Sequence, residues 1–166
     1  MTTMQNTQDG IASGDAAPEK SDALVSFGVS GDLAKKMTFV SLYRLAERGL
    51  LKIPFIGVAF TDWSDDEFRA HALQSIKDCG QAVDEKVWNA MSAKMTYVQG
   101  DYTKPETYAA VKEKLGDAKC PLFYLEIPPS LFLTAVKGLH DVGATRNARV
   151  VIEKPFGHDY QSAVEL

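Results

Sequence analysis

Residues 23–34 read ALVSFGVSGDLA, a strand-length apolar run followed at once by a glycine-rich turn. Gly28, Gly31 and Ala34 have the G-x-x-G-x-x-A spacing, a variant of the fingerprint that binds the diphosphate of a dinucleotide. Gly28 permits a tight turn, Gly31 permits close approach of a diphosphate, and Ala34 permits close packing of the next helix. The spacing predicts a strand, a phosphate-binding turn and a helix whose N–H groups face the phosphates. A tight turn without a ligand is the alternative.

Further runs of strand length follow along the chain and alternate with helical patterns. The predicted strands are 23–28, 55–59, 96–99, 122–127 and 149–153, and the predicted helices are 33–48, 64–78, 84–93, 103–115, one from Ser130 and one begun at Asp159. The second, fourth and fifth strands are almost continuously apolar, which is typical of strands buried on both faces of a parallel sheet. Capping-box spacing marks two of the helix starts, at Ser64 with Glu67 and at Thr103 with Glu106. We therefore predict an α/β fold, a Rossmann-like parallel sheet with helices on both faces in a single domain.

Composition narrows the class of protein. The 166 residues are 45% hydrophobic and 24% charged, as in a globular domain, and the net charge is −4. An acidic balance argues against binding to nucleic acid or to an anionic membrane surface. Cys79 and Cys120 form no C-x-x-C motif, so we expect them reduced and buried. The scattered histidines predict no metal site, and we expect His71 and His140 on helix surfaces.

The first 22 residues are polar and contain no run long enough for a signal peptide. We expect residues 1–22 to be a disordered tail and residues 23–166 to be a dinucleotide-binding domain. No segment reaches the length of a membrane helix, so we expect a cytoplasmic protein. The chain stops within its last predicted helix, so we expect the domain to be truncated and incomplete at its C-terminus.

Three motifs resemble those of one enzyme family. Residues 28–34 resemble the G-x-S-G-D-L-A coenzyme motif of glucose-6-phosphate dehydrogenases. Residues 124–129, YLEIPP, resemble the Y-L-A-L-P-P segment of that family, and residues 149–157, RVVIEKPFG, resemble its R-x-x-x-E-K-P-F-G segment. The motifs occur in the order of the family and span nearly all of the predicted domain. They cover only the amino-terminal coenzyme domain of the family, and its larger substrate domain has no counterpart here.

The resemblance implies a set of binding residues at the carboxyl ends of the strands. The residues expected to hold the diphosphate are Gly28, Val29, Ser30, Gly31, Asp32, Leu33, Ala34 and Lys35. Pro128, with Ile127, is expected to border the nicotinamide, and Lys154 is expected to contact both coenzyme and substrate, beside a cis bond to Pro155. From the residues alone, Asp32 can instead cap the helix, the Pro128-Pro129 pair can be a rigid strand stop, and Lys154 can be a solvated surface lysine.

The residues after the second predicted strand bear on the choice of coenzyme. The family commonly has an arginine for the 2′-phosphate of NADP at the position of Phe60. Phe60 cannot bind a phosphate, but its ring can stack on an adenine. Asp62 can accept a hydrogen bond from a ribose 2′-hydroxyl, which favours NAD, or it can be a simple turn residue. We expect NADP through the resemblance, with NAD also possible.

The resemblance implies an oxidoreductase of the pentose phosphate pathway. The full-length enzyme, expected to be a homo-oligomer, would transfer a hydride from C1 of glucose 6-phosphate to NADP and give 6-phosphoglucono-lactone. The catalytic histidine of the family lies in an R-x-D-H-x-x-G-K segment, which places it past Leu166, so His158 is not assigned as a base. We expect no catalytic residue here and no turnover by this chain alone. The alternatives are a non-catalytic nucleotide-binding module and another NAD(P)-dependent sugar oxidoreductase. The latter would use a Tyr-x-x-x-Lys pair, and we assign no such pair.

Overall fold

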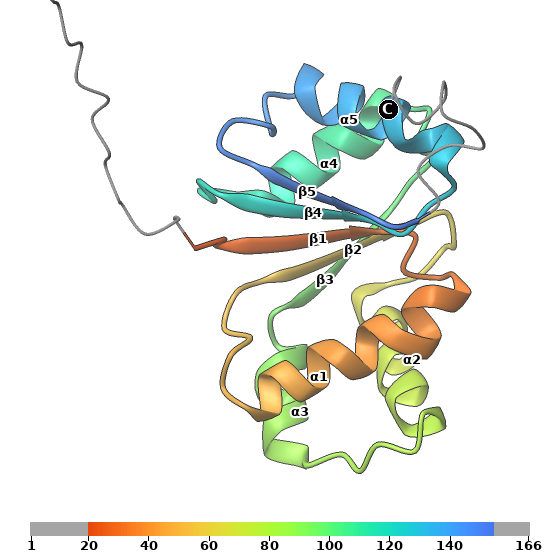
Figure 1. Cartoon of the computed structure of the whole chain (residues 1–166), viewed down its shortest axis with the longest axis vertical. Coiled ribbons are helices and arrows are strands. Elements are labelled where there is room, and N and C mark those ends of the chain that lie inside the picture. The colour runs from red at the N-terminus through yellow and green to blue at the C-terminus, as the bar shows by residue number, and fades with distance from the viewer. Residues whose placement is uncertain (1–19, 155–166) are drawn as a thin grey trace, which may run out of the picture.

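The computed structural model describes residues 20–154, and these form a five-stranded sheet in the order β3-β2-β1-β4-β5 (Figure 1). All four neighbouring pairs run parallel. The strands are β1 (Ala23–Phe27), β2 (Phe55–Ala59), β3 (Met95–Gln99), β4 (Pro121–Leu125) and β5 (Arg149–Ile152). Each strand lies within two residues of its predicted bounds, and the predicted parallel α/β fold is confirmed. Most of the predicted tail and the helix from Asp159 lie outside the described residues.

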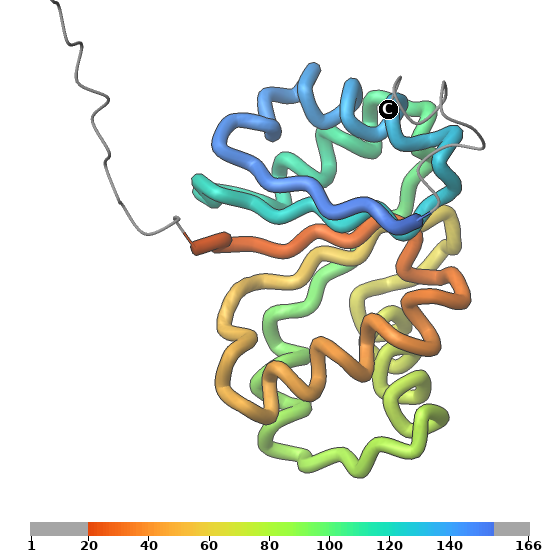
Figure 2. Tube along the Cα trace, in the orientation of Figure 1, coloured from red at the N-terminus to blue at the C-terminus, as the bar shows by residue number. Residues whose placement is uncertain are grey.

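Helices cover both faces of the sheet, as predicted. They are η1 (Ala34–Thr38), α1 (Phe39–Glu47), α2 (Asp65–Asp78), α3 (Glu85–Ser92), α4 (Pro105–Leu115), η2 (Pro129–Leu131) and α5 (Phe132–Asp141). The helices α1, α2 and α3 lie on one face, and α4 and α5 lie on the other (Figure 1). The tube in Figure 2 shows the chain leaving β1, turning, and running back across the sheet in η1 and α1. The carboxyl ends of the five parallel strands therefore share one edge with the start of the first helix.

Local sequence signals explain how two of the helices begin. At α2 the predicted capping box is present, because the Glu67 N–H donates to Ser64 Oγ (3.2 Å) and the Ser64 N–H donates to Glu67 Oε2 (2.7 Å). These hydrogen bonds also hold the pKa of Glu67 below its usual value. The predicted capping box at α4 is wrong. The Thr103 hydroxyl donates to Asp101 (2.7 Å) instead. The cap lies one residue later than predicted, at Lys104, and the first helical residue is Pro105.

The core has two layers, one on each face of the sheet. Phe39, Phe55 and Phe68 pack edge to face or tilted between the sheet and the helices α1 and α2, with ring centroids 5.8–6.4 Å apart. Phe27 and Tyr108 pack on the side of α4 and α5. Every residue of β1 and β2 is buried.

Burial is incomplete at the β5 edge, so the expectation that the fifth strand is buried on both faces is wrong. Val150 and Val151 are 46% and 42% exposed, because within residues 20–154 no helix packs closely against β5, whereas α2 and α4 cover the other edge strand, β3. Beside it, an apolar groove of about 470 Å³ separates α1 from the face of β4 and β5. Leu24, Met37, Leu45, Leu122, Tyr124 and Val151 are among the residues that line this groove.

Of the remaining expectations about individual residues, some are confirmed and others are wrong. Cys120 is buried, as expected, but Cys79 is exposed at the end of α2, where its Sγ lies 3.4 Å from the carbonyl oxygen of Lys36. Asp22, expected in the tail, accepts hydrogen bonds from the N–H groups of Lys119 (2.6 Å) and Cys120 (2.9 Å). Among residues 20–154, no helix combines the length and the apolar composition that a membrane crossing needs.

Candidate coenzyme-binding site

The turn after β1 has a backbone conformation that only glycine adopts easily. Gly28 has φ = +92°, and a Cβ atom added to it would lie 2.3 Å from the carbonyl oxygen of Glu126. The Gly28 N–H also donates to the Val58 carbonyl (2.8 Å). Gly28 is thus held between the ends of β2 and β4, and any side chain would displace backbone. The predicted tight turn is present.

The remainder of the turn has buried side chains on its inner side and exposed residues on its outer side. Val29 and Ala34 are fully buried, and the Gly31 N–H donates to the Gly28 carbonyl (2.9 Å). Ser30, Gly31 and Asp32 are exposed. The outer surface of the turn therefore presents backbone at the start of a helix, where the partial positive charge of the helix favours an anion. A diphosphate fits such an arrangement.

The first helix opens with a π-helical segment, η1, which contains both lysines that follow the turn. Lys35 and Lys36 are exposed, and π-helical turns recur at functional sites. Lys36 Nζ lies 3.2 Å from Asp32 Oδ2. This pair is solvent-exposed and contributes little to stability. The alternative that Asp32 caps the helix is not observed, because Asp32 is itself helical and its carboxylate accepts from the Lys36 side chain.

A half-buried carboxyl group, that of Glu126, lies next to the turn, and the sequence reasoning missed it. Ser26 Oγ donates to one carboxylate oxygen of Glu126 (2.6 Å), and Thr38 Oγ1 donates to the other. Burial raises the pKa of Glu126, and the negative charge of the nearby Glu153 raises it further. The hydrogen bonds from the two hydroxyl groups act in the opposite direction and lower it. The available signal was a glutamate where the resembling segment Y-L-A-L-P-P has alanine.

The ends of β4 and β5 carry the remaining predicted residues. Pro128 is exposed and caps η2, while Ile127 is buried beside Gly28, 3.2 Å from the added Cβ. The Tyr124 hydroxyl donates to Glu153 Oε1 (2.5 Å). Lys154 follows directly and is exposed. Because all strands are parallel, Lys154 stands at the same edge of the sheet as the glycine turn. The bond to Pro155 lies outside the described residues.

The loop after β2 presents an aromatic ring to the same edge. The Phe60 side chain is 62% exposed, and its ring packs edge-on against Tyr102, with the centroids 6.3 Å apart. The Thr61 carbonyl accepts a hydrogen bond from the Tyr97 hydroxyl (2.7 Å), which fixes the loop. Asp62 is exposed. The accessible Phe60 ring offers a surface for stacking but no positive charge for a phosphate.

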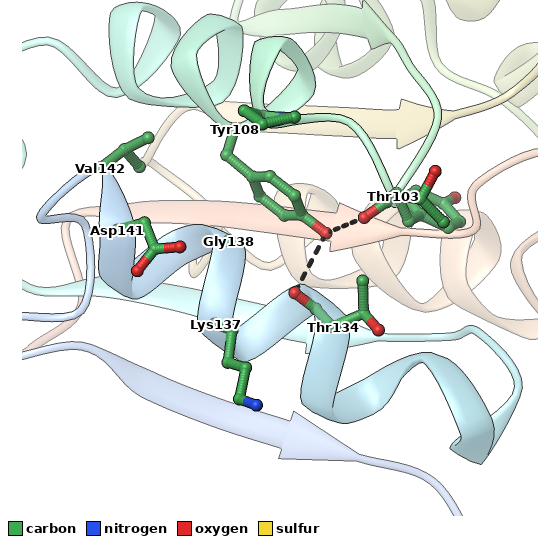
Figure 3. Close-up of a pocket in the computed structure, with 9 residues that line it drawn as sticks. Thr103, Tyr108, Thr134, Lys137, Gly138, Asp141 and Val142 are labelled. Atoms are coloured by element: carbon green, nitrogen blue, oxygen red, sulfur yellow. Dashed lines mark hydrogen bonds between the residues drawn. The ribbon is translucent and has the colours of Figure 1, made fainter.

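The geometry argues against the alternative of another NAD(P)-dependent sugar oxidoreductase that uses a Tyr-x-x-x-Lys pair. The expectation that the sequence contains no such pair is wrong, because Tyr108 and Lys112 have this spacing. However, the Tyr108 side chain is buried between α4 and α5, and its hydroxyl donates to the Tyr102 carbonyl (2.6 Å) (Figure 3). The ring covers Gly138, where an added Cβ would lie 2.2 Å from it. Burial raises the pKa of Tyr108 to about 12. Tyr108 is a packing residue and does not reach a substrate.

Neither histidine within residues 20–154 supplies a base at this edge. His71 is not the surface residue we expected, because its ring packs between Trp63 and Phe39 at centroid distances of 4.5 and 5.8 Å. Burial and the positive charge of Lys35 lower its pKa. His140 is exposed, as expected, and His158 lies outside the described residues. Within residues 20–154, no group of three histidine, cysteine or acidic side chains could hold a metal ion.

Comparison with known proteins assigns the family. The family model described as glucose-6-phosphate dehydrogenase, NAD binding domain, matches residues 25–166. The chain belongs to the glucose-6-phosphate dehydrogenase NAD-binding domain family. The resemblance that the three motifs indicated is thereby confirmed over nearly the whole predicted domain.

Individual members of the glucose-6-phosphate dehydrogenase family are also similar to this chain in sequence. Glucose-6-phosphate 1-dehydrogenase 1 of Mycobacterium tuberculosis is 44% identical over 146 residues, which are 88% of this chain and 31% of the relative. The enzyme of Kluyveromyces lactis is 35% identical over 160 residues, which are 89% of this chain and 32% of the relative. The chain therefore spans about a third of the length of these relatives.

Two solved structures of glucose-6-phosphate dehydrogenases share the fold. The crystal structure of the Mycobacterium avium enzyme is 44% identical, has a TM-score of 0.85, and is matched over 89% of this chain and 32% of that chain. A glucose-6-phosphate dehydrogenase in complex with its substrate glucose-6-phosphate is 31% identical, with a TM-score of 0.73 over 90% of this chain and 34% of that chain.

Proposed function

We propose that this chain is the coenzyme-binding part of a glucose-6-phosphate dehydrogenase. The whole enzyme transfers a hydride from C1 of glucose 6-phosphate to NADP and gives 6-phosphoglucono-lactone, the reaction of the pentose phosphate pathway. The observation that carries the proposal is the Gly28 turn, which lies where β1 and β4 meet. In parallel sheets of this strand order, the crevice beside the carboxyl ends of the central strands is where dinucleotides bind. The named activity of the relatives supports the reaction.

The residues of this chain would bind and orient the reactants. The turn from Gly28 to Lys35, including Val29, Ser30, Gly31, Asp32, Leu33 and Ala34, holds the diphosphate. Pro128 borders the nicotinamide, and the Lys154 ammonium contacts both the coenzyme and the phosphorylated sugar. When bound, the coenzyme supplies the hydride acceptor. This arrangement lowers the barrier by bringing the reactants together in one orientation.

The chain alone is expected to bind coenzyme without turning over. A base must take the C1 hydroxyl proton as the hydride leaves, and the R-x-D-H-x-x-G-K segment of the family does not occur in these 166 residues. A dehydrogenase assay of the purified chain tests this point. Reduction of NADP at a rate typical of its relatives would overturn it.

NADP is the proposed coenzyme, with NAD as the second candidate. The exposed ring of Phe60 stacks on the adenine, and the exposed Lys35 and Lys36 supply positive charge for the 2′-phosphate. Asp62 favours NAD, because a carboxylate repels a 2′-phosphate and accepts a hydrogen bond from a hydroxyl. Titrations with the two coenzymes on the same protein preparation decide between them. Tighter binding of NAD would overturn the assignment of NADP.

The decisive experiment is the substitution Gly28→Ala, followed by a calorimetric titration with NADP. The added Cβ collides with the backbone of Glu126, so we expect binding to weaken at least about tenfold, which corresponds to about 1.4 kcal/mol. Gly49→Ala is the matched control, because Gly49 also has a positive φ (+69°) but no atom within 4 Å of the added Cβ. Should Gly28→Ala fail to fold, Gly31→Ala narrows the same surface without a positive φ. Unchanged affinity in a folded turn variant contradicts the proposal.

A further inference from the structure

Glu126 touches three segments of the coenzyme site at once. Its carboxylate accepts hydrogen bonds from Ser26 at the end of β1 and from Thr38 in η1. Its backbone N–H donates to the Phe27 carbonyl (2.9 Å), and its carbonyl oxygen faces Gly28. The helix behind the turn and the ends of both central strands are therefore joined through one side chain. Loss of that side chain would leave two hydroxyl groups without their acceptor.

The negative charge of ionised Glu126 would repel an anionic ligand at this site. The groups that face Glu126 from β1, η1, β4 and β5 are the hydroxyl groups of Ser26 and Thr38, the Tyr124 hydroxyl, and the Glu153 carboxylate, which Tyr124 contacts. No ion pair joins Glu126 to a lysine or arginine in the described part of the chain. When ionised, it brings a negative charge to the edge where the diphosphate would lie, and burial strengthens repulsion between like charges.

We propose that Glu126 is a positioning residue of the coenzyme site, which ties η1 to the ends of β1 and β4 and, when ionised, opposes binding of the dinucleotide. The inference rests on the proposed function, because it needs the diphosphate to bind at the Gly28 turn. It goes beyond that function by giving the site a protonation-dependent affinity. The dinucleotide binds more tightly to the protonated form, so affinity falls as pH rises through the Glu126 ionisation.

The test is a series of NAD titrations from about pH 4.3, the usual glutamate pKa, upward. NAD is the probe because it lacks the 2′-phosphate, whose second proton leaves near pH 6 and would add its own pH dependence. For the unaltered chain we expect the dissociation constant to rise roughly tenfold across the transition, the size of effect that a partly screened charge has on an anion. Glu126→Gln removes the charge but keeps the shape, and both hydrogen bonds remain possible when one hydroxyl group rotates to accept from the amide N–H. Its affinity should therefore stay at the low-pH value throughout.

Two further variants separate positioning from charge. Glu126→Ala also removes the charge, but it releases η1, so at low pH it should bind NAD more weakly than Glu126→Gln. Ser26→Ala removes a hydrogen bond that favours the ionised form. The fall in affinity should therefore move to higher pH in that variant, and this shift tests the inference even where the Glu126 variants fail to fold.

The outcomes distinguish the two proposals. If the unaltered chain binds neither NAD nor NADP at any pH, the proposed function fails and this inference fails with it. If the chain binds NAD but Glu126→Gln shows the same pH profile, only the role of Glu126 is overturned. Equal low-pH affinities for Glu126→Gln and Glu126→Ala overturn the positioning role alone.

Discussion

The strands β2 and β5 have similar apolar sequences and different surroundings. All five residues of β2 are buried, whereas Val150 and Val151 of β5 are 46% and 42% exposed. β2 lies between β1 and β3, and β5 has β4 as its sole neighbour in the sheet of residues 20–154. The other edge strand, β3, is largely buried because α2 and α4 pack against it. An apolar run thus shows that a strand is suited to burial, while the helices packed on it determine how much of it is covered. The same side-chain substitution should therefore cost very different amounts in the two strands.

The largest effect is expected at Phe55 in β2. Its ring is 1% exposed and contacts the rings of Phe39 and Phe68. Phe55→Ala removes this packing and should lower the free energy of unfolding by about 3–5 kcal/mol. Urea denaturation followed by circular dichroism measures the loss. A loss below about 1 kcal/mol would contradict the close packing of the β2 region.

A smaller loss is expected when atoms are added to β2. A Cβ on Gly57 would lie 2.4 Å from Cζ of Phe68, so Gly57→Ala overpacks the core and should cost about 1–3 kcal/mol. Denaturation of the double variant Gly57→Ala/Phe68→Leu provides the control. The smaller leucine makes room, so the two losses should be less than additive. Strict additivity would show that the collision is not the cause.

The half-buried His71 should make stability depend on pH. Its pKa is lowered in the folded chain by burial and by Lys35, so below the unfolded value of about 6.5 the unfolded chain takes up the proton first. The stability that His71 contributes is therefore complete above about pH 6.5 and decreases as the pH falls toward the folded pKa. Comparison of the unaltered chain with His71→Phe isolates this effect. If the free energy of unfolding of the two proteins depends on pH in the same way, the role of His71 is refuted.

The smallest effect is expected in β5. Val151→Ala removes methyl groups from a side chain that is already 42% exposed, so the free energy of unfolding should change by no more than about 0.5 kcal/mol. The same urea experiment as for Phe55→Ala measures it, and the pair of values expresses the contrast between the strands directly. A loss in β5 as large as that in β2 would remove the distinction.

Features with local causes were predictable from the sequence. The glycine spacing at residues 28–34, the strand periodicity and the Ser64 cap each depend on residues a few positions apart, and each is present. The family motifs added the expected roles of Pro128 and Lys154, which local patterns do not give. At Thr103, a competing bond to Asp101 removed the predicted cap.

Contacts between distant residues were not predictable from local patterns. The hydrogen bond between Ser26 and Glu126 joins residues 100 positions apart, and the bond from Thr38 spans 88. The exposure of β5 depends on which strands the helices cover, and the burial of His71 depends on Phe39 and Trp63 from other segments. In each case the surroundings of the residue are determined by the tertiary fold, so the periodicity of the sequence cannot predict them.

The strand order has a consequence for synthesis. Of the five strands in residues 20–154, β1 leaves the ribosome before the others, yet it is the central strand, and one of its two partners is β4. Until β4 emerges, one edge of β1 is a row of unpaired backbone N–H and C=O groups in an apolar strand, and such edges promote aggregation in nascent chains. Chaperone dependence during translation should therefore end only once residues 121–125 are outside the exit tunnel.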